Sequence, residues 1–110
     1  MENVLDYPVV GVTFDGRQDI LDRFYGGYAH GHVYGVHLEK EDDNQYDCNA
    51  VAVELETHPG VYEKVGYISK DANVQMRCRW DRIKRASLRS IGPNRNGQIG
   101  LAISVVYEED

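Results

Sequence analysis

The sequence predicts a mainly β domain: a closed or nearly closed antiparallel barrel of about six strands with two short α-helices. Its length is the first observation, because 110 residues suffice for one hydrophobic core and residues 1–110 are therefore expected to form one domain. Short segments that alternate apolar and polar side chains, separated by turn residues, are the second. The third is that two segments have apolar residues at helical spacing. Closure of the sheet is favoured because it removes exposed edges.

The first half of the chain predicts a strand, a helix and a second strand. Residues 7–14 are apolar and β-branched, as in an opening strand. Asp15 as N-cap, with Gln18 three residues later, predicts the start of a short helix that the Gly26-Gly27 pair ends. Residues 32–40 then alternate and predict a strand. The apolar face of the helix consists of Ile20, Leu21, Phe24 and Tyr25.

The second half predicts two hairpins on either side of a second helix. Residues 49–56 and 61–68 are strands joined by a turn, and Ser69 is the expected N-cap of the helix that follows. Residues 84–91 and 98–107 are the last two strands, joined by a loop in which Asn-Gly reverses the chain. The helix presents Ala72, Met76 and Trp80 at four-residue spacing.

Charge is distributed unevenly along the chain, whose formal net charge is −6. Residues 64–95 hold nine Lys or Arg against two Asp, whereas residues 1–63 hold three basic and thirteen acidic residues. The basic segment, including Arg77 and Arg79, is able to face a polyanion such as DNA. The alternative is a solvated helix face balanced by acidic neighbours. The sequence leaves the orientation of these arginines open.

Catalytic and metal-binding motifs are not found in the sequence. His30, His32, His37 and Cys48 match no established zinc spacing, and a strand would send His32 and His37 to opposite faces. Nucleophile elbows, zinc-protease motifs and phosphate-binding loops are also missing. We therefore predict a non-enzymatic domain with neither metal nor cofactor.

The sequence also favours a cytoplasmic location with no membrane contact. No apolar run approaches the roughly 18 residues of a membrane span, and the first residues do not resemble a signal peptide. Cys48 and Cys78 show no disulfide or zinc pattern and fit a reducing compartment.

The most distinctive chemistry lies in residues 44–53 and 66–70. Two rings, a carboxylate and an ammonium group, from Tyr46, Tyr67, Asp47 and Lys70, fall at the ends of paired strands. Rings stack on bases, lysine binds phosphate, and an ionised Asp accepts a hydrogen bond from a sugar hydroxyl. Because a carboxylate repels phosphates, such a group suits a strand terminus. The alternative is structural: Asx turns formed by Asn44 and Asp47, and tyrosines that cover the barrel mouth.

The order of these motifs resembles the HIRAN domain. The matching motifs are an opening Val-x-Gly at residues 10–12, Asn-x-Tyr-Asp-x-Asn-Ala-Val-Ala-Val at 44–53 and Val-Gly-Tyr-Ile-x-Lys at 65–70. HIRAN domains are fused to Swi/Snf-type helicases and ubiquitin ligases of DNA repair, and also stand alone in bacteria and phages. The resemblance covers roughly residues 7–107. It implies an OB-like barrel with a pocket for the 3′ end of single-stranded DNA.

By position, the resemblance assigns roles to four residues of the second and third motifs. Tyr46 and Asp47 match residues that hold the terminal nucleotide, with Asp47 as the partner of its 3′-hydroxyl. Asn44 matches a polar group of the pocket, and Lys70 matches a phosphate contact.

Three other positions depart from the family pattern. Tyr67 stands where helicase-linked members can carry histidine, and Phe14 stands where they carry tyrosine. Thr13 replaces an expected arginine, which removes a phosphate contact and predicts modest affinity.

We therefore predict a module that binds single-stranded DNA ends in DNA repair, replication or mobile-element processing, with a helicase or nuclease as protein partner. The alternative is a protein-interaction or regulatory module of the same fold with a degenerate DNA pocket, motivated by the net charge and by Thr13. DNA versus RNA preference and oligomeric state are left open. The predicted nucleic-acid-binding residues are Phe14, Asn44, Tyr46, Asp47, Tyr67, Lys70, Arg77 and Arg79.

Overall fold

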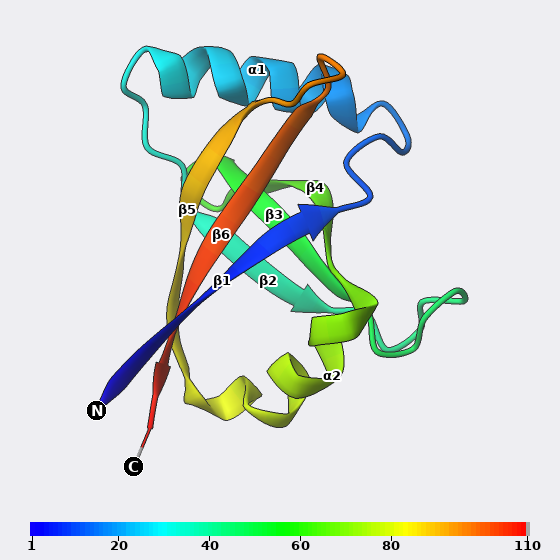
Figure 1. Cartoon of the computed structure of the whole chain (residues 1–110), viewed down its shortest axis with the longest axis vertical. Coiled ribbons are helices and arrows are strands. Elements are labelled where there is room, and N and C mark those ends of the chain that lie inside the picture. Colours follow the sequence, from blue (N-terminus) through cyan, green and yellow to red (C-terminus); the bar gives the residue numbers. More distant parts are fainter. Residues whose placement is uncertain (110) are drawn as a thin grey trace.

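Six strands form one antiparallel sheet that carries two α-helices (Figure 1), in a computed structural model that describes residues 1–109. The strands are β1 (Glu2–Val10), β2 (Val36–Lys40), β3 (Val51–His58), β4 (Val61–Ile68), β5 (Ile83–Pro93) and β6 (Ile99–Glu108). The helices are α1 (Arg17–Ala29) and α2 (Lys70–Cys78), and the 3₁₀ turn Trp80–Arg82 follows α2. Within residues 1–109, neither helix is long and apolar enough to cross a membrane.

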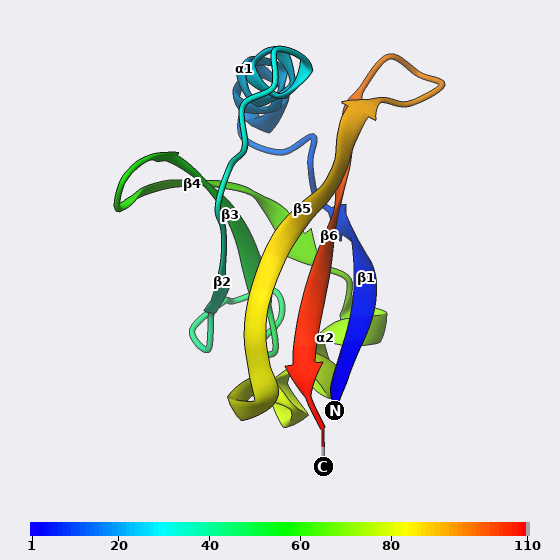
Figure 2. The same cartoon turned by 90° about the vertical axis from the view of Figure 1, so that its left-hand side faces the viewer.

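The sheet curls into a barrel that stays partly open. Its strand order is β2-β3-β4-β1-β6-β5, and every neighbouring pair is antiparallel. Figure 2 shows β2, β3 and β4 on one side and β5, β6 and β1 on the other. Among the described residues, one isolated bridge, between Gly35 and Ser87, joins the two edges. The predicted small, OB-like, mainly β fold is confirmed, but the barrel is not closed.

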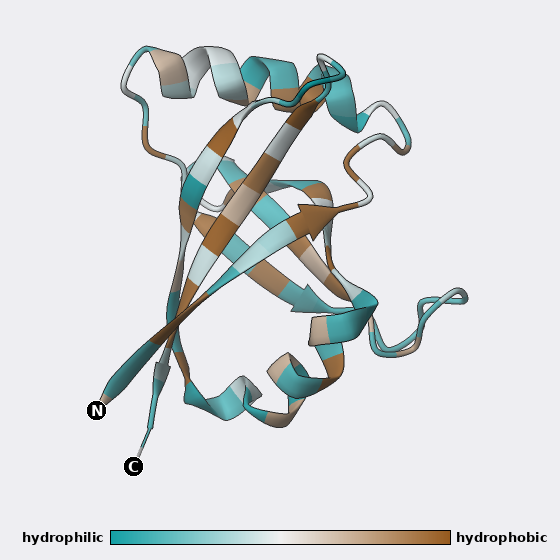
Figure 3. Cartoon of the chain, viewed as in Figure 1, coloured by the Kyte–Doolittle hydropathy of each residue, from teal (hydrophilic) through white to brown (hydrophobic). Residues whose placement is uncertain are grey.

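The core lies between the two halves of the curled sheet. In β6 the residues Leu101, Ile103, Val105 and Tyr107 alternate inward, and Figure 3 shows this alternation of apolar and polar positions along the strands. Tyr107 shares a buried hydroxyl–hydroxyl hydrogen bond of 2.7 Å with Tyr7. Buried side chains of this size contribute about 1.5–3 kcal/mol each, so the core is the main source of stability.

The two helices pack at opposite ends of the barrel (Figure 1). Leu21 and Phe24 of α1 are buried, as the predicted apolar face requires. Met76 of α2 is buried at the other end, near which both termini lie. The helices therefore contribute apolar side chains to the two ends of the core.

The first strand begins and ends earlier than predicted. It covers Glu2–Val10 rather than residues 7–14, because its first half pairs with the end of β6, with Glu2 opposite Glu108. It stops where Gly11 adopts a φ of +71°, a conformation that glycine accepts without strain. Phe14 consequently lies in a turn instead of on a strand.

The first helix begins later than predicted. Its N-cap is Gly16, at a φ of +74°, and Asp15 precedes it in a left-handed turn without capping the helix. Gln18 forms no capping box. Its amide instead donates to the carbonyl of Val12 at 3.0 Å and pairs with the backbone of Ile99, which anchors the start of α1 to β6.

The Gly26-Gly27 pair does not end this helix, which continues to Ala29. Gly27 leaves room for Tyr34, whose ring also meets Phe24 edge-on at 4.7 Å between centroids. Because Tyr34 packs against α1, β2 begins at Val36 rather than at residue 32. The remaining four strands and the Ser69 N-cap position agree with the prediction to within two residues.

β4 crosses β1 most closely at Gly66. A Cβ at this position would overlap the carbonyl oxygen of Val10 and approach Val9 Cγ1 to 2.6 Å. Val10 pairs with Tyr67, so this close approach also fixes where Tyr67 meets the end of β1. A residue without a side chain is therefore a packing requirement here.

We expect Gly66→Ala to lower the free energy of unfolding by about 2 kcal/mol, because backbone atoms of β1 must move to accommodate the methyl group. Urea denaturation followed by circular dichroism measures this change. Gly100→Ala in β6 is the matched control, since a Cβ there meets nothing within 4 Å. Equal stability of the two variants would contradict the packing argument.

Candidate functional site

The loop at residues 41–50 is closed by its own hydrogen bonds. The backbone N–H of Glu41 donates to the carbonyl of Ala50 at 2.9 Å, which joins the two ends of the loop. Inside it, Asn44 Oδ1 accepts the backbone N–H groups of Tyr46 at 2.9 Å and Asp47 at 3.0 Å. This Asx turn leaves the Tyr46 side chain projecting, 84% exposed. Asn44 thus shapes the loop that presents Tyr46 and Asp47.

Asp47 is a fixed, ionised carboxylate. Its Oδ1 accepts the backbone N–H of Asn49 at 2.9 Å, and its Oδ2 accepts the amide of the buried Asn73 at 2.8 Å. These two hydrogen bonds, followed by the charge of Lys70, hold the pKa of Asp47 below its ordinary value. A carboxylate has about four acceptor sites, so each oxygen can still accept a hydrogen bond from a ligand.

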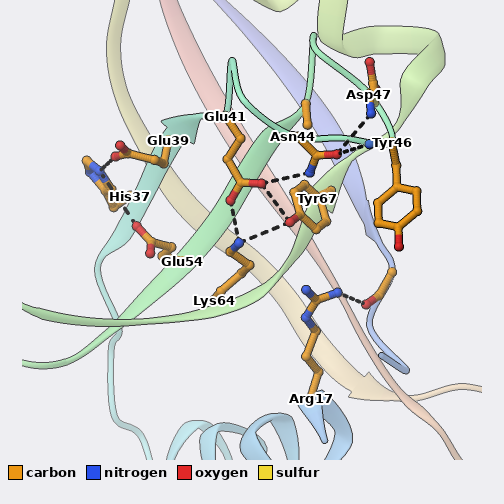
Figure 4. Close-up of polar contacts among 12 residues, drawn as sticks. Arg17, His37, Glu39, Glu41, Asn44, Tyr46, Asp47, Glu54, Lys64 and Tyr67 are labelled. Atoms are coloured by element: carbon orange, nitrogen blue, oxygen red, sulfur yellow. Dashed lines mark hydrogen bonds and ion pairs between the residues drawn. The ribbon is translucent and has the colours of Figure 1, made fainter. Parts of the chain in front are cut away.

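Tyr67 connects this loop to the sheet. Its hydroxyl donates to Glu41 Oε1 at 2.9 Å and accepts from Lys64 Nζ at 3.1 Å, and Lys64 also pairs with Glu41 Oε2 (Figure 4). Burial raises the pKa of Glu41, but hydrogen bonds from Lys64, Asn44 and Tyr67 outweigh it and lower the pKa below about 4.5. Glu41 is therefore ionised at neutral pH and accepts from three side chains.

The side chains of Arg17, Tyr67 and Phe14 lie close together around Gly11. A Cβ on Gly11 would lie 3.4 Å from Arg17 Nη1, 3.6 Å from Tyr67 Cδ2 and 4.0 Å from Phe14 Cδ2. The guanidinium carbon of Arg17 lies 5.3 Å from the centroid of the Tyr67 ring. Phe14 itself is 65% exposed, so its ring is available to a ligand. Because Gly11 has no side chain, Arg17, Tyr67 and Phe14 can all lie close to its backbone.

The structure thus brings several of the predicted site residues into one cluster. Asn44, Tyr46 and Asp47 share the loop, Asn44 and Tyr67 both bond to Glu41, and Phe14 lies against Gly11 beside Tyr67. Lys70 is exposed at the first residue of α2, close enough for its charge to act on Asp47.

Arg77 and Arg79 are held by contacts within the protein. Arg77 donates to Asp42 at 2.7 Å and to the carbonyls of Asn49 and Ala50 at 2.8 Å each, so it braces the loop from α2. Arg79 lies 4.1 Å from the Tyr107 ring centroid and pairs with Glu109, near the chain termini. Whether either residue contacts nucleic acid stays a prediction.

Three basic side chains of β5 neutralise acidic residues of β1. Lys84 and Arg85 pair with Glu2 at 2.9 and 3.3 Å, and Arg89 pairs with Asp6 at 3.1 Å, across the intervening β6. Part of the charge asymmetry along the sequence is therefore used for ion pairs between β5 and β1. These side chains do not form a positive rim around Asp47.

Four residues of the cluster were not identified from the sequence: Arg17, Glu41, Lys64 and Asn73. Lys64 was missed because strand alternation puts residues three apart on opposite faces. A bulge changes this, since Val53 pairs with Gly66 while Glu54 pairs with Lys64, leaving Val65 as an extra residue. The position of Arg17 depends on the left-handed turn at residues 15–16. The contact of Asn73 with Asp47 depends on how α2 packs against the loop. For these four residues, the one sequence signal was that Glu41 is an acid close to the motif at residues 44–53.

A separate group on β2 and β3 has the donor atoms of a metal site. His37 Nε2 lies 2.9 Å from Glu39 Oε2 and 3.8 Å from Glu54 Oε1 (Figure 4). One donor atom from each residue lies within 4.8 Å of the others. Glu54 is the cross-strand partner of His37, and Glu39 lies two residues along the same face. The contact between His37 Nε2 and Glu39 is a hydrogen bond between neighbours on one face of the sheet.

Two open clefts among the described residues lie away from the Asp47 cluster. A cleft of about 240 Å³ at the open seam is lined by residues of β2 and β5 with Trp80, and one of about 160 Å³ lies between α1 and the β3–β4 hairpin. The cluster is instead an open surface of rings and charges, a form suited to an extended ligand.

No family model matches this chain, and no curated protein or solved structure matches it either. The resemblance to the HIRAN domain therefore rests on the motif residues described above.

Glu41→Gln is expected to destabilise the protein by about 1–2 kcal/mol at pH 7, because the ionised carboxylate accepts bonds from three side chains. The folded-state pKa of Glu41 is lowered, so its contribution is present above about pH 4.5 and lost as pH falls through the folded value. The difference between wild type and variant should therefore shrink toward pH 3.

Urea denaturation at pH 7 and pH 3 measures this effect. Asp43→Asn is the control, because Asp43 is exposed in the same loop and its side chain forms no hydrogen bond or ion pair among residues 1–109. A difference for Glu41→Gln that stays constant with pH would exclude the ionised carboxylate as its cause.

Proposed function

We propose that this chain is a non-enzymatic module that binds the 3′ end of single-stranded DNA. The observation that carries the proposal is Asp47, an ionised carboxylate with free acceptor sites that lies beside the 84% exposed ring of Tyr46. A carboxylate accepts a hydrogen bond from a terminal hydroxyl and repels a phosphate at the same place. Such a group distinguishes the end of a strand from its interior.

Exposed aromatic rings support the proposal because they provide stacking surfaces. Tyr46 and Phe14 project from two different loops, and neither ring makes an aromatic contact among residues 1–109. Stacking on a base contributes about 1–3 kcal/mol and tolerates any base. Tyr67 plays another part, since Arg17 covers its ring and its hydroxyl is bonded to Glu41. Tyr67 therefore mainly positions neighbouring groups of the site, and its ring is a lesser stacking surface.

Positive charge near Asp47 is limited, which sets the expected affinity. Lys70 is exposed at the start of α2 and suits a phosphate contact. Most of the basic segment is paired with acids, and the net charge is −6. Because phosphate contacts supply most of the affinity for nucleic acid, binding should be weak and sensitive to salt.

The biological setting is part of the same proposal and rests on the resemblance to the HIRAN domain. It places the module in DNA repair, replication or mobile-element processing, with a helicase or nuclease as partner.

Asp47 should make binding depend on the chemistry of the strand end. We expect an oligothymidylate with a 3′-hydroxyl to bind at least about tenfold more tightly than one with a 3′-phosphate, as one charged hydrogen bond implies. Asp47→Asn should remove most of this preference. Fluorescence anisotropy with 5′-labelled oligonucleotides measures it, with Asp43→Asn as the control variant. Equal binding of the two ends by the wild type would contradict the assigned role.

Loss of a stacking ring should weaken binding without changing end preference. We expect Tyr46→Ala to reduce affinity for the 3′-hydroxyl oligonucleotide by about fivefold or more, the equivalent of one lost stacking contact. Tyr28→Ala is the matched control, because Tyr28 is 39% exposed on α1 outside the cluster. Unchanged affinity of the Tyr46 variant would show that its ring does not contact the strand.

The second candidate function is a protein-interaction module of the same fold. It is favoured by the pairing of Arg77, Arg79, Lys84 and Arg89 with acids of the protein, which leaves little positive surface for DNA. A basic partner would then dock on acidic side chains such as Asp42 and Asp43. Absence of any oligonucleotide binding near 50 mM salt, where electrostatic contacts are strong, would favour this function over DNA binding.

A further inference from the structure

Arg17 is the one charged side chain that is buried within residues 1–109. It is 8% exposed, whereas every other basic residue of the described chain is partly or fully exposed. Burial of a charge is costly unless an opposite charge or several hydrogen bonds compensate for it. The surroundings of Arg17 therefore indicate what it binds.

Those surroundings hold no carboxylate partner for Arg17 within the described chain. Its Nη1 donates to the carbonyl of Gly11 at 2.6 Å, and its guanidinium carbon lies 5.3 Å from the centroid of the Tyr67 ring (Figure 4). A guanidinium has five N–H groups, and this is the one hydrogen bond that Arg17 forms with residues 1–109. By contrast, Arg23, Arg77, Arg79, Arg85 and Arg89 all pair with carboxylates.

Two further donors of Arg17, Nε and Nη2, are not fully buried. They form no hydrogen bond with any residue of the range 1–109, and no fully buried side-chain nitrogen of the described residues lacks a partner. Glu41, which is bonded to the Tyr67 hydroxyl, is already occupied by Lys64, Tyr67 and Asn44. Arg17 therefore has donors that no acid among the described residues occupies.

We infer that Arg17 binds a backbone phosphate of the captured strand, next to the rings of Tyr67 and Phe14. A guanidinium offers two parallel N–H groups that match the oxygens of a phosphate. Gly11 leaves the approach clear because a side chain there would contact Arg17, Tyr67 and Phe14. An anion bound beside exposed aromatic surface fits a nucleotide better than a simple inorganic ion.

This assignment also gives the bound strand a direction. Figure 4 shows Asp47 and Arg17 on opposite sides of the cluster, with the rings of Tyr46 and Tyr67 between them. The terminal hydroxyl lies at Asp47 and the chain runs past the rings toward Arg17. The inference thus rests on the proposed capture of a 3′ end and adds where the rest of the strand goes.

The test is the salt dependence of oligonucleotide binding. Each phosphate contact on a single strand contributes about −0.7 to the slope of log K against log salt concentration. With Arg17 and Lys70 each neutralising one phosphate, the wild type should give a slope of about −1.4 and Arg17→Gln about −0.7. Affinity at about 50 mM salt should fall at least about tenfold, as loss of a charged hydrogen bond implies.

Two further variants and a melting measurement separate the effects of charge, location and fold. Arg17→Lys should keep the slope but lose affinity, because an ammonium cannot form the paired contact. Arg23→Gln removes an exposed arginine from the same helix and should change neither slope nor affinity. Circular dichroism melts show which variants fold, and if Arg17→Gln does not, Arg17→Lys carries the test. A folded Arg17 variant with wild-type slope and affinity would overturn the inference.

A separate titration distinguishes this inference from the proposed function. Inorganic phosphate and a 3′-hydroxyl oligothymidylate are each added to ¹⁵N-labelled wild type and Arg17→Gln, and the amide signals of residues 11–17 are followed. Oligonucleotide-induced shifts in the wild type that are absent from the variant support the phosphate contact. If inorganic phosphate shifts these signals and the oligonucleotide does not, Arg17 binds an anion, but the inference that it binds the captured strand is overturned. No shift with either probe overturns the inference, even if the oligonucleotide binds elsewhere with end preference.

Discussion

Tyr67 joins three segments of the chain that are far apart in sequence. Its backbone pairs with Val10 at the end of β1, its hydroxyl bonds to Glu41 at the start of the loop, and its ring carries the guanidinium of Arg17 from α1. The position of Tyr67 depends in turn on Gly66, which lets β4 approach β1 closely. Tyr67 therefore links the loop that carries Asp47, the end of β1 and the start of α1.

Electrostatics in this protein is local. The net charge of −6 argues against nucleic acid, and the basic segment argues for it, but both are averages over the sequence. In the fold, the basic side chains of β5 meet the acidic side chains of β1 and cancel. What remains around the cluster is Lys70 beside Asp47 and, on the opposite side, Arg17 without a carboxylate partner among the described residues, so the capacity to bind an anion depends on very few groups.

Local pattern predicted most of the fold and part of the site. Strands β3 to β6 and the α2 cap followed from alternation and turn residues, because these depend on neighbours in sequence. β1 and α1 were misplaced because Gly11 and Gly16 adopt left-handed conformations that end one element and start the next. Tyr46 and Asp47 were found because a single loop presents them. Lys64 required the bulge at Val65, and Asn73 required the docking of α2.

The sequence by itself determined a small mainly β domain and the residues whose chemistry suits a strand end, because side-chain type and strand alternation are local properties. Tertiary structure alone decided that the barrel stays open between β2 and β5, that the basic side chains of β5 are neutralised by β1, and that Arg17 lies buried without an acid. These outcomes depend on which remote segments meet, and that is set by packing in the core and by close backbone approach at Gly66.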